Sequence, residues 1–113
     1  RLTQIDYYNE MALIAVKPSS QGEEQIGVAR YYTNPDQRSG EFALVVSDAW
    51  QGHGIGHQLM QNLMEIARDR GLEFMEGQVL SNNTRMLKLM RSLNFSIGQN
   101  LEDSGIKQVT IGL

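Results

Sequence analysis

The fold is decided by Gln51-Gly52-His53-Gly54-Ile55-Gly56-His57, a stretch at which the spacing of apolar residues changes. Before it, Glu41–Val46 has the composition of a buried strand, and after it apolar residues recur at helical spacing from Ile55 to Arg70. Glycines at alternate positions remove Cβ atoms that would hinder a sharp bend or a close approach to a ligand. The sequence therefore predicts a strand, a glycine turn and a helix in succession.

Further elements are expected on both sides of this turn. Short apolar or alternating runs predict strands at Met11–Val16 (ended by Pro18), Gln25–Thr33, Leu72–Leu80 (with a candidate bulge at Gly77) and Ile106–Ile111, and a further short strand near Ser96–Leu101 stays open. The first two are joined by a short polar connection and can form one hairpin. Apolar residues from Met86 to Leu93 predict a second helix. The order β-β-β-α-β-α-β predicts an α/β (α+β) fold with helices packed on a mixed sheet.

The composition limits what this chain can be. With 113 residues it has room for one domain, residues 1–113. Ten Lys and Arg against thirteen Asp and Glu give a net charge of -3, which argues against nucleic acid or an anionic membrane as a partner. Because cysteine is absent, there is no thiolate nucleophile and no cysteine-based metal site. We expect a cytoplasmic protein and, since the sequence opens on Arg1, a piece of a longer one.

The start of the helix at Ile55 is a candidate anion site. The first N–H groups of a helix have no partner inside it, and the helix dipole adds partial positive charge there. A phosphate or pyrophosphate is the natural ligand, although the glycines are also explained by the geometry of a strand-to-helix turn. A Walker A loop is excluded because the turn has no lysine. A dinucleotide fingerprint starting at Gly52 is excluded by His57, where a small residue is required.

The pattern Gln-x-x-Gly-x-Gly, carried by Gln51, Gly54 and Gly56, resembles the pyrophosphate signature Gln/Arg-x-x-Gly-x-Gly/Ala of the GNAT superfamily of acyl-CoA-dependent N-acetyltransferases. The resemblance extends over roughly residues 11–113. The runs Arg1–Tyr7, Glu10–Leu13 and Gly40–Ala43 resemble the GNAT module of bacterial Pat-type protein lysine acetyltransferases. The resemblance implies the GNAT fold, a mixed and mostly antiparallel sheet flanked by helices, whose first strand and first two helices would lie before Arg1.

The resemblance implies an acyltransferase that moves an acetyl group from acetyl-CoA to a primary amine, without a metal. The expected acceptor is the side-chain amine of a protein lysine, attacking directly in a ternary complex, and an acyl-CoA synthetase is a candidate protein substrate. A small-molecule amine acetyltransferase is one alternative. A non-catalytic acyl-CoA-sensing regulatory domain, which keeps the glycine turn but has no working base, is another. Assembly into a homo-oligomer stays open.

Glu41 is the candidate general base. A base is needed because the amine of a lysine is almost entirely protonated at pH 7. Strand alternation places Glu41 on the face opposite to Phe42 and Leu44. The resemblance adds that the Pat-like proteins have their general base at the matching position. A carboxylate that merely faces solvent at a strand end is the alternative.

The resemblance also implies which residues contact the cofactor. Backbone groups of Leu44, Val45 and Val46 would pair with the pantetheine arm, as an added strand does. The pyrophosphate would be held by backbone N–H groups of the turn and by the helix start, at Gln51, Gly52, His53, Gly54, Ile55, Gly56 and His57. Asn83 matches an asparagine that often contacts the cofactor, and a helix N-cap is its alternative explanation.

Met90 departs from the family pattern. Many GNAT enzymes have a tyrosine here that protonates the leaving thiolate, and because methionine cannot donate a proton no general acid is assigned. His53 and His57 are four residues apart, but the adjacent glutamate of a zinc motif is missing, so no metal site is expected. Tyr31 and Tyr32 either line an acceptor groove or pack between strands.

Overall fold

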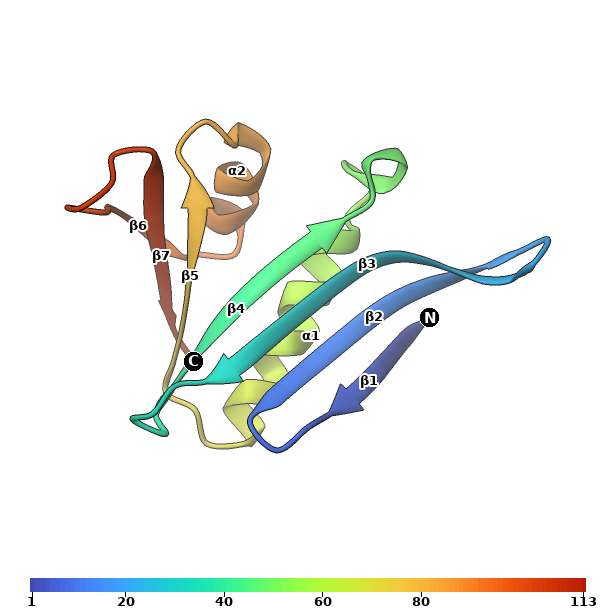
Figure 1. The fold of residues 1–113 in the computed structure, drawn as a ribbon, viewed down its shortest axis with the longest axis horizontal. Coiled ribbons are helices and arrows are strands. Elements are labelled where there is room, and N and C mark those ends of the chain that lie inside the picture. Colours follow the sequence, from blue (N-terminus) through green and yellow to red (C-terminus); the bar gives the residue numbers. More distant parts are fainter.

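Seven strands form one sheet in the order β1-β2-β3-β4-β5-β7-β6, in a computed structural model that describes residues 1–113 (Figure 1). The strands are β1 (Leu2–Asp6), β2 (Glu10–Ser19), β3 (Gly22–Thr33), β4 (Ser39–Val46), β5 (Phe74–Leu80), β6 (Ser96–Gln99) and β7 (Ile106–Gly112). The helices are α1 (Ile55–Asp69), α2 (Thr84–Ser92) and the short 3-10 turn η1 (Asp48–Trp50). The predicted hairpin, both helices and the short strand after the second helix are confirmed. Neither α-helix has the length and apolar character needed to cross a membrane.

β4 and β5 are the one pair of neighbouring strands that run parallel, and all other neighbours are antiparallel. Their pairing joins Ser39–Glu41 to Phe74–Glu76 and then stops. Beyond it the two strands diverge, as Figure 1 shows. The expected mixed, mostly antiparallel sheet is confirmed, and the short β4–β5 pairing joins its two halves, β1–β4 and β5–β7–β6.

α1 packs an apolar stripe on β2, β3 and β4. Leu59, Leu63 and Ala67 recur at helical spacing and therefore share one helix face, and all three are fully buried. Full burial of a leucine side chain contributes about 1.5–3 kcal/mol, so this stripe holds the helix firmly to the sheet. The helix ends at Asp69, and Gly71 follows in the left-handed conformation, with φ of 88°.

A ring fills the space beside Gly77, where the sequence suggested a bulge. That expectation is wrong, because the β5–β7 register runs without a shift. A Cβ atom at Gly77 would lie 2.5 Å from Cε1 of Phe42. The Phe42 ring also packs on Phe95, with 5.4 Å between the ring centroids. Glycine at this position thus lets a β4 side chain contact the other half of the sheet beyond the last backbone pair.

Two features of the N-terminal strands differ from the sequence prediction. β1 was not predicted, since Leu2 and Ile5 are its only apolar residues and an edge strand exposes much of its surface. β2 does not end at Pro18 but continues to Ser19. The N–H of Val16 faces β1 and donates to the Arg1 carbonyl at 2.9 Å. The nitrogen of Pro18 faces the same side, beyond the end of β1, where no ladder bond is needed.

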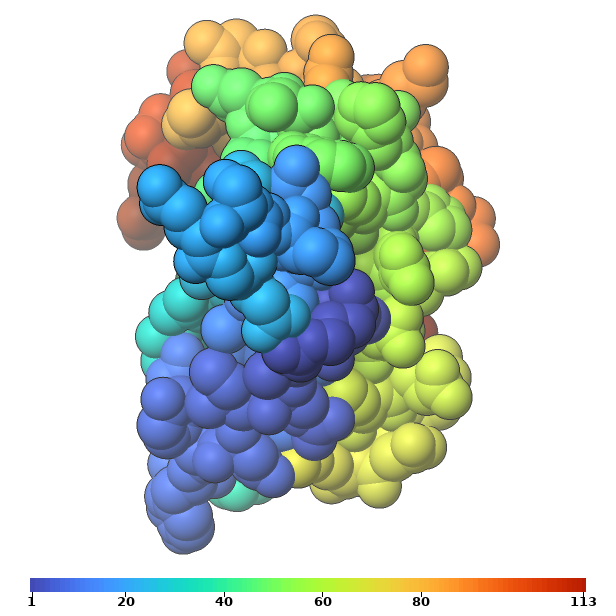
Figure 2. Space-filling view, turned by 90° about the vertical axis from the view of Figure 1, so that its right-hand side faces the viewer, coloured from blue at the N-terminus to red at the C-terminus, as the bar shows by residue number.

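Figure 2 views the molecule from the β1 edge, with β1 and β2 (blue) beside α1 (yellow-green). The segment between β4 and α1 (green) lies at one end, and the loop after α1 (yellow) at the other. Near the yellow end, Arg70 donates to both carboxylate oxygens of Asp6, at 3.0 and 2.5 Å. This ion pair ties the end of α1 to β1 and lowers the pKa of Asp6.

Candidate functional site

The glycine turn presents a row of free backbone N–H groups. Gly52 and Gly54 have φ of 82° and 81°, a conformation that strains any residue with a Cβ atom. The first helical hydrogen bond is donated by Gln58 to the Gly54 carbonyl, at 3.0 Å. The amides from Gly52 to His57 therefore have no acceptor within the chain. Consecutive free amides at a helix start form a concave site for an anion.

Gln51 supports this turn with its side chain. Its Nε2 donates to the Val46 carbonyl at 3.2 Å and to Asp48 Oδ1 at 3.1 Å. Its own backbone N–H donates to the Asp48 carbonyl at 3.4 Å. The Gln51 amide is thus occupied, unlike those that follow it, and the residue fixes the turn against the end of β4.

Gly56 brings α1, α2 and β4 close together on one face of the sheet. A Cβ atom at Gly56 would lie 3.1 Å from Cδ2 of Leu89 on α2 and 3.4 Å from Cδ2 of Leu44 on β4. A larger residue here would press on the Leu89 side chain, which would have to give way by a few tenths of an ångström. Both helices therefore cover the face to which Leu44 points, and the face that carries Glu41 has no helix on it.

A groove of about 600 Å³ runs between the glycine turn, β4 and α2. Several residues predicted to contact a cofactor line it, namely Leu44, Val46, Gln51, Gly52, Gly54, Gly56, His57 and Asn83. Three predicted residues do not: Val45, His53 and Ile55. The Val45 side chain points to the opposite face and is 68% exposed, and the His53 ring packs near Trp50, with 5.6 Å between centroids. Ile55 packs towards Gly27 on β3.

The groove is positively charged although the chain is acidic. Arg85 and Lys88 on α2 line it, and no Asp or Glu does. Arg85 reaches over the turn, since its Nη1 lies 3.6 Å from the Cβ position of Gly52. Neither cation was predicted from the sequence, although their spacing of three residues on a helix is a visible signal that they share a face. The negative net charge of the whole chain does not reveal that this groove is positively charged.

Asn83 has the capping role that was its alternative explanation. It is the N-cap of α2, and its Oδ1 accepts the N–H of Met86 at 3.1 Å. It also lines the groove, so one residue both caps the helix and forms part of the groove wall. The residue thereby fixes the start of the helix that carries Arg85 and Lys88.

Glu41 lies on the face of the sheet opposite to the groove. It is exposed, and its direct partners are Tyr32 on β3 and Glu76 on β5. The predicted alternation along β4 is confirmed, with Phe42 and Leu44 facing the helices. Glu41 is in the last pair that joins β4 to β5, on the face of the sheet without helices, and it does not line the groove.

The remaining positions considered from the sequence, Met90, Tyr31 and Tyr32, differ in how far they are buried. Met90 is fully buried in the core and offers no proton. Tyr31 is only 2% exposed and packs inside, where it lines a small cavity with Arg70 and Leu72 away from the groove, and burial raises the pKa of its phenol. Tyr32, by contrast, is 49% exposed beside Glu41.

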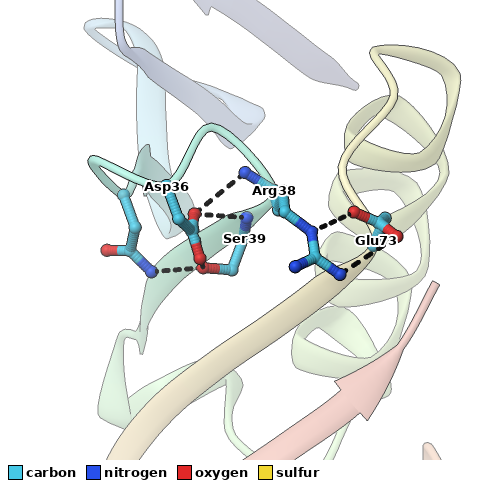
Figure 3. Close-up of polar contacts among 5 residues, drawn as sticks. Asp36, Arg38, Ser39 and Glu73 are labelled. Atoms are coloured by element: carbon cyan, nitrogen blue, oxygen red, sulfur yellow. Dashed lines mark hydrogen bonds and ion pairs between the residues drawn. The ribbon is translucent and has the colours of Figure 1, made fainter.

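A polar cluster anchors the start of β4 (Figure 3). Asp36 Oδ1 accepts the backbone N–H groups of Arg38 and Ser39 at 2.9 and 3.0 Å, and these bonds lower the pKa of its carboxyl. Arg38 Nε donates to Glu73 at 2.5 Å and lowers the pKa of that carboxyl too. Since Glu73 directly precedes β5, the cluster fixes the end of the sheet where β4 and β5 begin to pair.

The sequence of this chain is similar to those of known acetyltransferases. The model of the acetyltransferase (GNAT) family matches residues 3–95. An acetyltransferase of Pseudomonas aeruginosa is 28% identical over 109 residues, which are 96% of this chain and 58% of that protein. An L-methionine sulfoximine/L-methionine sulfone acetyltransferase of Pseudomonas paraeruginosa is 37% identical over 67 residues, 59% of this chain and 39% of the relative. The chain thus spans little more than half of the first relative and less of the second.

A solved structure gives the same fold. The GNAT domain of S. lividans PAT superposes with a TM-score of 0.82 at 24% sequence identity, covering 98% of this chain and 65% of that one. The fold of this chain therefore belongs to a known architecture.

Proposed function

The chain belongs to the acetyltransferase (GNAT) family, and from this membership we propose that it transfers an acetyl group from acetyl-CoA to a primary amine. The observation that carries the proposal is the run of free amides from Gly52 to His57, set in a groove with two cations and no acid. Such a site suits the pyrophosphate of coenzyme A. We place the reaction in the cytoplasm, as the sequence predicts.

The groove fits an extended nucleotide-carrying thioester. Its volume of about 600 Å³ is in the usual range for a small-molecule site. Arg85 and Lys88 would meet the phosphate groups, and the amides from Gly52 to His57 would donate to the pyrophosphate. The side of Leu44–Val46 that faces away from β3 has no strand partner, so its backbone groups are available to the pantetheine amides.

Glu41 would act as the general base. At a pKa near 10.4, only about one lysine amine in 2,500 is neutral at pH 7, so the acceptor must lose a proton. The Glu41 carboxylate would take it, directly or through water, and the nitrogen lone pair would then attack the thioester carbonyl in a ternary complex. A thiol-linked acetyl-enzyme is excluded because the chain has no cysteine. The coenzyme A thiolate leaves without help from Met90, which is buried.

We propose a protein lysine as the acceptor. The support is the resemblance of Arg1–Tyr7, Glu10–Leu13 and Gly40–Ala43 to Pat-type modules, for which an acyl-CoA synthetase is a candidate partner. The second candidate is a small-molecule amine, favoured by the 37% identity with an L-methionine sulfoximine/L-methionine sulfone acetyltransferase. A non-catalytic acyl-CoA sensor would use the same groove without turnover.

The test combines binding and turnover. Acetyl-CoA at a hundred times its Kd should stabilise the folded chain by about 2.7 kcal/mol, which thermal unfolding detects. Release of free coenzyme A is then followed with lysine peptides, small amines and amino acids as acceptors. Absence of any stabilisation by acetyl-CoA contradicts the proposal. Stabilisation without turnover on any acceptor supports the sensor instead.

A further inference from the structure

Strand pairing places three exposed side chains in a row across the face that has no helix. Tyr32 is the direct partner of Glu41, and Glu41 is the direct partner of Glu76. Directly paired residues point to the same face, and neighbouring strands lie about 4.8 Å apart. A tyrosine ring and two carboxylates are therefore adjacent where the β4–β5 pairing ends, and all three are exposed.

The two carboxylates of the row have no basic partner. Neither has a Lys, Arg or His nitrogen within 4.0 Å, whereas Glu10, the next acid along the same row, is paired with Arg30 at 3.5 Å. Like charges on directly paired residues destabilise a sheet. The arrangement therefore costs free energy that a bound cation would offset. Local violations of this kind are expected where function requires them.

A hydrogen bond from Asn34 distinguishes Glu76 from Glu41. Its Nδ2 donates to Ser39 Oγ at 2.8 Å and to Glu76 Oε1 at 3.2 Å. Ser39 in turn donates to Asp36, within the cluster of Figure 3. Glu76 is thus held from the β3–β4 loop, whereas no side-chain hydrogen bond holds Glu41. One carboxylate is held by a hydrogen bond and the other is not.

We propose that Tyr32 and Glu76 position the acceptor as an ammonium ion while Glu41 takes its proton. The inference rests on the proposed function and adds two positioning residues for its cationic acceptor, which would enter from the face without helices. The acceptor N–H bond breaks and an O–H bond forms on Glu41, so the total charge of site and acceptor is unchanged. Glu76 takes no proton in this step, and the Tyr32 ring offers a cation–π contact. Both are positioning residues that select cationic amines.

A binding experiment tests the site without turnover. Nα-acetyl-lysine amide is titrated into the chain while the backbone amide signals of Tyr32, Glu41 and Glu76 are followed by NMR. Nα-acetyl-norleucine amide, which has the same carbon chain and no ammonium group, is the control ligand. We expect only the lysine derivative to shift these signals. Glu76→Gln and Tyr32→Leu should each weaken its binding roughly threefold to fivefold. Glu65→Gln, which removes an exposed carboxylate from α1, should leave binding unchanged.

Turnover gives a second readout. With an alkylammonium acceptor, Glu76→Gln should raise KM roughly threefold to fivefold and leave kcat nearly unchanged. With an arylamine, which is neutral at pH 7, the same variant should leave KM unchanged. Glu76→Asp, which keeps the charge, should bring the KM for the alkylammonium acceptor most of the way back to its original value. A rise in KM for both kinds of acceptor would mean a structural defect and would overturn the inference.

The two proposals fail in different ways. If the lysine derivative does not bind at the row, or binds Glu76→Gln as well as the unchanged chain, the ammonium site is refuted whatever amines are acetylated. If the lysine derivative binds as expected but no amine is acetylated, the cation site stands and the proposed transferase activity is refuted.

Discussion

Glu41 and Glu76 lie side by side at the last residue pair that joins β4 to β5. The same pair marks where backbone pairing between the two halves of the sheet stops. The groove lined by Arg85 and Lys88 lies on the helix face, and the two carboxylates lie on the other face. The sheet thus carries side chains of opposite charge on its two faces.

The adjacency of the two carboxylates predicts a gain in stability when one is neutralised. Glu76→Gln removes a like-charge contact and should raise the free energy of unfolding by roughly 0.2–1 kcal/mol. Urea unfolding at low salt measures the effect, and high salt should diminish it. Glu65→Gln, which removes a carboxylate from α1 and not from this pair, is the control. It should change neither the free energy of unfolding nor its dependence on salt. A Glu76→Gln chain less stable than the original would contradict the repulsion.

Replacement of Glu41 separates catalysis from binding. Glu41→Gln keeps the size of the side chain but cannot accept a proton, so turnover should fall by roughly a hundredfold to ten-thousandfold. Acetyl-CoA should still raise the unfolding temperature as before, because Glu41 does not line the groove. Unchanged turnover in this variant would remove Glu41 from its proposed role.

The left-handed conformation of Gly54 predicts a matched pair of variants. Gly54→Ala introduces strain of about 1–2 kcal/mol and tilts the free amides, although nothing lies within 4 Å of the added methyl group. Acetyl-CoA affinity should fall roughly fivefold to tenfold. Gly22→Ala, also at positive φ and also without neighbours within 4 Å, carries similar strain in the β2–β3 turn. Calorimetric titration should find the affinity of that second variant unchanged.

The cations of α2 predict a salt-dependent affinity. Arg85→Gln should weaken acetyl-CoA binding roughly fivefold at low salt, and by less at high salt, since exposed charge pairs are screened. Arg91→Gln is the control because Arg91 is exposed on the same helix but does not line the groove. Equal losses in both variants would point to the net charge of the helix rather than to a contact with phosphate.

The ion pair between Asp6 and Arg70 predicts acid sensitivity. Its hydrogen bond lowers the pKa of Asp6, so the folded chain binds that proton less readily than the unfolded chain. The stabilisation is complete above the ordinary value of 3.8 and is lost as the pH falls below it. Unfolding measured by circular dichroism should therefore show a steeper loss of stability below pH 3.8 for the original chain than for Asp6→Asn. Asp69→Asn, at an exposed position of α1, should behave like the original.

The parts of the site that rest on local patterns were predictable from the sequence. The glycine turn, the helix from Ile55 and the alternation of Glu41 with Phe42 each follow from residues close together in the chain. Backbone conformation and side-chain facing are set within a few residues, so a short stretch of sequence contains the information.

The parts that rest on pairing between distant segments were not predictable. Glu41 meets Glu76 only because β4 and β5 pair in one particular register after a whole helix has intervened. Arg85 reaches Gly52 only because α2 packs beside the start of α1. β1 was missed for the same reason, since its strand conformation depends on pairing with β2.

The contact between Phe42 and Gly77 helps to set how the two halves of the sheet meet. Backbone pairing between β4 and β5 ends at Glu41, so beyond it the spacing of the two halves depends on how this ring seats against the far strand and Phe95. A methyl group added at position 77 would overlap the ring and displace either the ring or the far strand. One small substitution there would therefore change how the two halves meet while the order of the strands stays the same.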